Sequence, residues 1–184
     1  MPRLFTALEI PTAIAVQVSM LQSGLEGARW IERENFHITL RFIGDVPPPI
    51  AREVIYELER VKSPPLDITL GALDVFGNAK PHSLFVSVKK NAALEQLRAE
   101  QDNICRRLGL EPDKRKFTPH LTIARIRGVN TASIAKYLFE RGLLANQSFP
   151  VSRFVLLSSR DSVGGGPYRL EESYELVERE RANA

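Results

Sequence analysis

The sequence contains His37-Ile38-Thr39-Leu40 and, 83 residues later, the matching tetrapeptide His120-Leu121-Thr122-Ile123. Each lies in a run rich in β-branched and aliphatic residues, which predicts a β-strand. Because successive side chains of a strand point to opposite faces, the histidine and the threonine of each motif share one face. Two of the three histidines in the chain occur in this pattern. The two motifs are therefore predicted to form one paired functional site.

The chemistry of this pair follows from its residue types. Two such strands facing one cleft would supply a general acid, a general base and two hydroxyl groups that can bind an anion. An unperturbed imidazole has a pKa of about 6.5, so both of its protonation states are accessible near neutral pH. The pattern therefore indicates acid–base cleavage of a phosphodiester.

The segments that flank the motifs indicate an internal duplication. Arg3–Glu9 is similar to Ser83–Lys89 at an offset of 80 residues, close to the offset of 83 between the two motifs. In each half, an apolar strand is followed by a helix-like stretch and then by a histidine strand. We expect two lobes related by a pseudo-twofold axis, with one histidine strand from each lobe facing a shared cleft.

The coarse periodicity predicts an α+β fold. Helices are expected from Thr12, from the prolines at 47–49, over residues 92–108 and from Thr131, with Thr12 and Thr131 as N-caps. Strands are expected in the intervening apolar segments. We expect a single domain over residues 1–184, with antiparallel sheets around a central cleft, helices on the outside and a frayed end at residues 178–184.

Several segments resemble the two-histidine (2H) phosphoesterase superfamily, and within it the bacterial and archaeal RNA 2′,3′-cyclic phosphodiesterases, historically called 2′-5′ RNA ligases. The similar segments span nearly the whole chain: Arg3–Pro11, Asn35–Gly44, Pro119–Arg125, Ser158 and Gly166-Pro167-Tyr168. The paired motif at this spacing is specific to the superfamily. The resemblance implies two antiparallel sheets that form the cleft, and hydrolysis of 2′,3′-cyclic phosphate ends to 2′-phosphomonoesters, with 2′-5′ ligation as the reverse reaction.

The resemblance also implies individual roles. His37 resembles the proton donor to the leaving 3′ oxygen, and His120 resembles the proton acceptor. The motif symmetry alone does not say which histidine is the acid. Thr39, Thr122 and Arg125 are expected to bind the phosphate, with Arg125 assigned from the resemblance.

Two arginines, Arg125 and Arg41, are candidates for binding the phosphate. Arg125 is five positions after His120, so strict alternation places it on the opposite face of the strand, and only a bulge or the strand end would turn it into the cleft. Arg41 is four positions after His37 and has the correct parity without such help. Arg41, Phe42 and Tyr168 are candidate substrate contacts, although Phe42 has the parity of the apolar back face.

Charge, apolar content and cysteine count indicate where the protein works and what it can bind. The net charge is +3, which is mild, but Lys114-Arg115-Lys116 precedes the second motif and Arg125 and Arg127 follow it. No apolar run reaches the roughly 20 residues of a membrane span. The start of the chain lacks the features of a signal peptide, and a single cysteine fits a reducing cytoplasm. We expect a cytoplasmic monomer without an obligatory protein partner.

The histidine motifs supply one good metal ligand per strand, and no cluster of cysteines or carboxylates lies near them. We therefore expect metal-independent chemistry without a cofactor. Two alternatives stay open. One is a phosphodiesterase of the same superfamily that acts on 2′-5′ oligonucleotides or on ADP-ribose cyclic phosphate. The other is a non-catalytic nucleotide-binding module.

Overall fold

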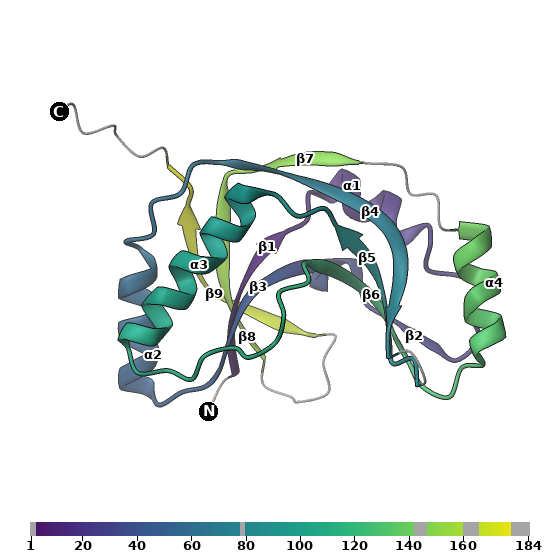
Figure 1. The fold of residues 1–184 in the computed structure, drawn as a ribbon, viewed down its shortest axis with the longest axis horizontal. Helices are drawn as coiled ribbons and strands as arrows, with labels where there is room; N and C mark the ends of the chain where they lie inside the picture. Colours follow the sequence, from purple (N-terminus) through teal and green to yellow (C-terminus); the bar gives the residue numbers. More distant parts are fainter. Residues whose placement is uncertain (1–2, 78–79, 142–146, 160–165, 178–184) are drawn as a thin grey trace.

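The structure is a computed structural model that describes residues 3–77, 80–141, 147–159 and 166–177. Its main feature is an open antiparallel sheet with the strand order β7-β4-β5-β6-β3-β1-β8-β9, and β2 pairs with β6 (Figure 1). The strands are β1 Arg3–Glu9, β2 Ala28–Trp30, β3 His37–Asp45, β4 Leu66–Phe76, β5 Ser83–Val88, β6 His120–Ile126, β7 Ser148–Val151, β8 Arg153–Ser159 and β9 Tyr168–Glu175.

Four α-helices and one 3₁₀ helix connect these strands within the described ranges: α1 Thr12–Ser19, η1 Arg33–Asn35, α2 Pro48–Leu58, α3 Ala92–Arg107 and α4 Thr131–Arg141. A proline begins α2, where its missing N–H costs no hydrogen bond. The Asn91 side chain caps α3 by accepting from the Leu94 N–H at 2.8 Å. The predicted threonine caps are wrong: Pro11 precedes α1 without a side-chain cap, and the Asn130 side chain accepts from Ala132 N at 2.7 Å ahead of α4.

The two histidine strands lie side by side at the centre of the sheet. They pair through one residue of each motif, Ile38 with Leu121, which occupy equivalent positions after the two histidines. Continuing this antiparallel register places each histidine across from the threonine of the other strand. On either side follow β1 and β5, the two similar segments. The predicted pseudo-twofold axis therefore passes between β3 and β6.

The helices follow the same symmetry. Figure 1 shows α2 beside α3 at one end of the sheet and α4 at the other end. There the Tyr137 hydroxyl of α4 donates to the carbonyl of Leu21, two residues after the end of α1. The main core lies between these helices and one face of the sheet. A smaller apolar cluster of Phe5, Ala7 and Val155 lies on the other face, beside the cleft. The helices thus leave one face of the central strands free to carry polar side chains.

The α+β class is confirmed, with one refinement of the predicted architecture. The two expected antiparallel sheets are joined at β3 and β6 into one continuous sheet. No helix within the described residues is long and apolar enough to span a membrane. The predicted fraying at residues 178–184 lies outside the described residues.

Candidate active site

A cleft of about 640 Å³ lies over the central strands, and it collects both motifs. Its lining includes His37 and Thr39 from β3 and His120, Thr122 and Arg125 from β6. Phe42 and Tyr168, two of the candidate substrate contacts, also line it. The volume lies within the range of about 300–1,000 Å³ that is usual for small-molecule sites. Residues 83 positions apart in the sequence therefore share one cleft.

A β-bulge follows the threonine in each motif. In β6 the pairing with β5 shifts between Thr122 and Ala124, and in β3 the pairing with β1 shifts between Thr39 and Arg41. A bulge adds one residue to the strand and reverses the alternation of side chains beyond it. The bulge in β6 turns Arg125 toward the cleft. Strict alternation would have placed Arg125 on the opposite face, so this bulge is the one that a phosphate-binding role for Arg125 requires.

The same geometry corrects the expectation for Arg41. The bulge in β3 turns Arg41 away from the cleft, and its side chain is only 4% exposed. It pairs with Asp102 of α3 at 2.6 Å and donates to the Glu111 carbonyl at 2.6 Å. Phe42, which alternation assigned to the back face, lines the cleft instead. Arg41 therefore connects β3 to α3 and to the segment that leads toward β6, and it does not line the cleft.

Both histidines are held in the same way through one ring nitrogen. His37 Nδ1 lies 2.8 Å from the Asn35 carbonyl, and His120 Nδ1 lies 2.6 Å from the Thr118 carbonyl. A carbonyl oxygen can only accept, so both Nδ1 atoms carry the proton and donate it. In the neutral tautomer each Nε2 then has a free lone pair. Each imidazole is thus prepared to exchange a proton through Nε2.

Aromatic rings pack against each imidazole in a matching arrangement. The His37 ring lies 5.2 Å from Phe5 and 4.9 Å from Tyr168, which meets it edge-on. The His120 ring lies 5.3 Å from Phe85 and 4.8 Å from Phe76, again edge-on. These spacings are typical of favourable ring contacts. The tetrapeptides gave no indication of this packing, because the four rings come from β1, β9, β5 and β4.

The environment lowers the pKa of both histidines. Burial lowers the pKa of His37 to about 4, helped by the nearby charges of His120 and Arg125 and opposed by the hydrogen bond to Asn35. Burial also lowers the pKa of His120, with Arg125 and Arg115 acting in the same direction. Both imidazoles are therefore neutral at neutral pH when the cleft holds no anion. An acid role requires that a bound anion raise one of these pKa values.

This coupling predicts that anion binding takes up a proton. At about pH 5.5 free His37 is neutral, and a tetrahedral anion in the cleft should raise its pKa and protonate it. Sulfate is a suitable probe because it does not titrate in this range. Calorimetric titration in buffers of different ionisation enthalpy should give an uptake approaching one proton, which a His37→Gln variant should largely lose. Binding without proton uptake at any pH would contradict the coupling.

Cations surround the two motifs. Arg125 donates from Nη1 to the Ser83 hydroxyl at 3.0 Å, while its buried Nε has no hydrogen-bond partner within the described part of the chain. Buried donors without a partner are rare in folded proteins, so this Nε marks Arg125 as a candidate for a functional role. Sequence reasoning missed Arg3 and Arg98 and did not assign Arg115 and Lys116 to the cleft, although all four line it. Only the charge run before the second motif hinted at the last two.

A metal would need converging ligands. Within residues 3–77, 80–141, 147–159 and 166–177, no group of three or more histidine, cysteine or carboxylate side chains is placed to hold a metal ion. His82, the third histidine, is exposed at the rim of the cleft and stacks on Phe76 with ring centroids 6.5 Å apart.

Comparisons with known proteins agree with this geometry. A family profile described as the 2′-5′ RNA ligase superfamily matches residues 10–162. An RNA 2′,3′-cyclic phosphodiesterase of Aeropyrum pernix is 38% identical over 132 residues, which cover 70% of this chain and 75% of that protein. Among solved structures, TT0787 of Thermus thermophilus has a TM-score of 0.81 at 21% identity, covering 97% of this chain and 100% of that chain.

A further structural neighbour is E. coli LigT complexed with 3′-AMP. It has a TM-score of 0.76 at 21% identity and covers 97% of this chain and 100% of the other. At this identity both structural matches concern the fold. They extend the similarity to both lobes and to the strands that flank the cleft.

Proposed function

Because this chain belongs to the 2′-5′ RNA ligase superfamily, we propose that it is an RNA 2′,3′-cyclic phosphodiesterase that opens the cyclic phosphate to a 2′-phosphomonoester. The observation that carries the proposal is the pair of imidazoles in one cleft, each with its Nδ1 bound to a backbone carbonyl. Relatives that are named for this activity support the choice of substrate class.

The proposed reaction needs two proton transfers. His120 Nε2 removes a proton from water as the oxygen attacks phosphorus, and protonated His37 gives its Nε2 proton to the departing 3′ oxygen. The P–O3′ bond breaks, the new P–O bond forms, and a 2′-phosphomonoester with a free 3′ hydroxyl remains. The strained ring of the substrate lowers the barrier to this step. In 2′-5′ ligation a 5′ hydroxyl takes the place of water as the nucleophile on the same cyclic phosphate. This reaction runs parallel to hydrolysis and is not its reverse, so the same groups act in the same roles.

Negative charge on the phosphoryl oxygens needs fixed donors. The Thr39 and Thr122 hydroxyls and the Arg125 guanidinium border the same cleft as the imidazoles. Donors that are held in place before the reaction stabilise developing charge without reorganising. The same charge raises the pKa of His37, so substrate binding prepares the acid.

An RNA strand would extend beyond the phosphate. The Phe42 ring lies 6.0 Å from the Arg3 guanidinium and 5.5 Å from that of Arg115. Aromatic rings beside cations are typical of sites for single-stranded nucleic acid, where bases stack and phosphates are neutralised. Phe42, Arg3 and Arg115 are thus the proposed contacts for the strand 5′ of the cyclic phosphate. A single domain, a monomeric state and a cytoplasmic location complete the proposal.

Hydrolysis by this route should be independent of metal ions, because imidazoles perform both proton transfers. We expect full activity in EDTA on RNA with a 2′,3′-cyclic phosphate end, with the 2′-phosphomonoester as product, as measured by phosphorus NMR. The test panel includes cyclic mononucleotides, 2′-5′ oligonucleotides and ADP-ribose cyclic phosphate. Loss of activity on chelation that a divalent ion restores would reject the mechanism, and a marked preference for either of the last two substrates would reject the proposed substrate.

A further inference from the structure

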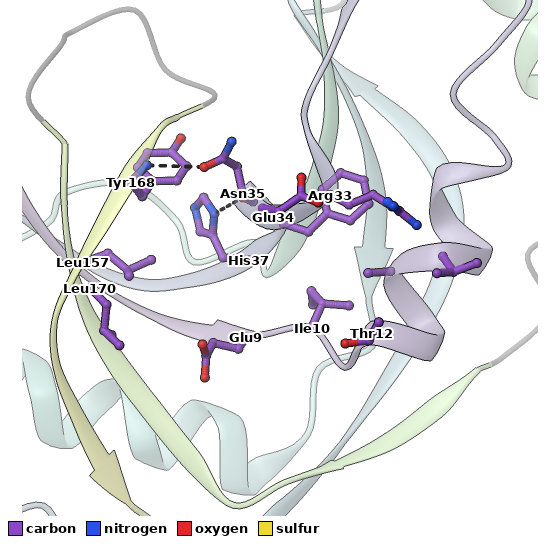
Figure 2. A pocket seen from close by; sticks show the side chains of 13 residues that line it. Glu9, Ile10, Thr12, Arg33, Glu34, Asn35, His37, Leu157, Tyr168 and Leu170 are labelled. Carbon is purple, nitrogen blue, oxygen red and sulfur yellow. Dashed lines mark hydrogen bonds between the residues drawn. The ribbon is translucent and has the colours of Figure 1, made fainter.

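His37 borders two cavities. One is the cleft, and the other has a volume of about 340 Å³ and is lined by His37 together with Asn35, Tyr168, Glu9, Arg33 and Leu157, among others (Figure 2). Space beside a ring leaves it free to turn unless specific contacts hold it. The orientation of His37 therefore depends on the few groups that touch it.

Asn35 connects most of these groups. Its carbonyl accepts the His37 Nδ1–H at 2.8 Å, and its side-chain oxygen accepts from the Tyr168 backbone N–H at 3.3 Å (Figure 2). The Tyr168 ring in turn meets the His37 ring edge-on at 4.9 Å. One residue thus holds the imidazole directly through its backbone and indirectly through β9.

The chain closes tightly around the Asn35 amide. Gly166 has a φ of +91°, and a Cβ added there would overlap the Asn35 side chain. Real Cβ atoms do not approach so closely, so any larger residue at 166 would displace the amide. The segment 166–168 and Asn35 therefore fit each other.

His120 has the same kinds of contact as His37, but its neighbours come from other parts of the fold. The residue two positions before it is Thr118, and both rings that pack on it come from the β4–β5 pair, Phe76 and Phe85. At His37, one of the two rings comes from β9, which lies beyond β8 in the sheet. The pseudo-twofold symmetry is broken at this point, and Asn35 supplies the link to β9.

We propose that Asn35 is a positioning residue that acts through His37: its amide fixes Tyr168 and its carbonyl fixes the imidazole, so that Nε2 stays directed into the cleft. It does not touch the reacting atoms in this proposal. Its effect on turnover rests on the proposed function, whereas its effect on the imidazole can be measured without any substrate.

The test compares Asn35→Ala and Gly166→Ala with Asn103→Ala. Asn103 is an exposed asparagine of α3 that bonds Arg106, so it is a matched control for loss of an amide. Both clamp variants, Asn35→Ala and Gly166→Ala, should lower kcat roughly 10- to 100-fold, as expected for a misplaced catalytic group, with a smaller change in KM. Asn35→Asp keeps the acceptor and should recover most of kcat, and its added negative charge should move the pH–rate profile to higher pH.

Nitrogen NMR of the three histidines gives the independent measurement. In the native protein His37 should be the Nδ1–H tautomer, and both clamp variants should shift its ring signals while those of His120 stay unchanged. If His37 keeps its native signals, or if His37 and His120 shift alike, Asn35 only supports the fold and the proposal is wrong. Absence of turnover on every cyclic phosphate would overturn the proposed function alone, because the spectra would still decide the role of Asn35.

Discussion

Replacing either His37 or His120 by alanine should slow the chemical step by roughly 10²- to 10⁴-fold, the usual contribution of a positioned acid or base. The two losses should be comparable, because each imidazole is held through Nδ1 by a carbonyl and offers Nε2 for one of the two transfers. Single-turnover measurements with a 2′,3′-cyclic-phosphate-ended RNA separate this step from product release.

The third histidine provides the control for these variants. His82 is exposed at the rim of the cleft, and its ring contacts Phe76, one of the two rings that pack on His120. The His82→Ala variant should therefore lower the rate of the chemical step by less than about 10-fold. The rate of the native enzyme should be bell-shaped in pH, and both limbs belong to the coupled pair. If the His120 variant turned over at a near-native rate while the His37 variant did not, a mechanism with a single histidine would be required.

The paired site could be predicted because its signal is local in sequence. Alternation within each motif sets which side chains share a face, and the repeated motif and its similar flanking strand indicate that two such faces meet. Antiparallel pairing of Ile38 with Leu121 is the structural counterpart of that repeat. These features depend on strand periodicity and on symmetry, both of which are visible in the residues.

The missed features depend on register and on distant strands. A bulge of one residue decides whether Arg41 or Phe42 enters the cleft, and nothing in that run distinguishes a regular strand from a bulged one. In β6 the need for a bulge could be stated only because the resemblance placed Arg125 at the phosphate. Arg98 enters the cleft from a helix, and Tyr168 meets His37 across several strands, so neither contact follows from sequence spacing.

The residue five positions after each histidine differs in chemistry between the two lobes. The bulges bring both residues into the cleft, but one lobe supplies Phe42 and the other supplies Arg125. Two arginines at this position would offer two cations to the phosphate and no ring for a base. The observed pair, a guanidinium and an aromatic ring, fits an asymmetric ligand that carries a phosphate and a base.

Replacing Arg125 by alanine should lower kcat/KM by roughly 10²- to 10³-fold, as expected when a preorganised donor to developing charge is removed. The guanidinium also lowers the pKa of both histidines. Its removal should therefore raise both pKa values and move the whole pH–rate profile to higher pH. Arg125→Lys keeps the positive charge but loses the forked pair of N–H donors of the guanidinium. Its pH–rate profile should therefore stay near the native position, and its rate should lie between those of the native protein and Arg125→Ala.

Arg127→Ala is the matched control, because it removes the same charge from an exposed position two residues further along, outside the cleft lining. Screening by solvent should leave its rate and pH profile close to native. Two mechanisms can then be separated. If Arg125 acts only by general attraction of a polyanion, both variants should weaken KM alike and lose their difference at high salt. If Arg125 binds the phosphate at the reacting centre, only its own variants should lower kcat and displace the profile, and added salt should not restore either.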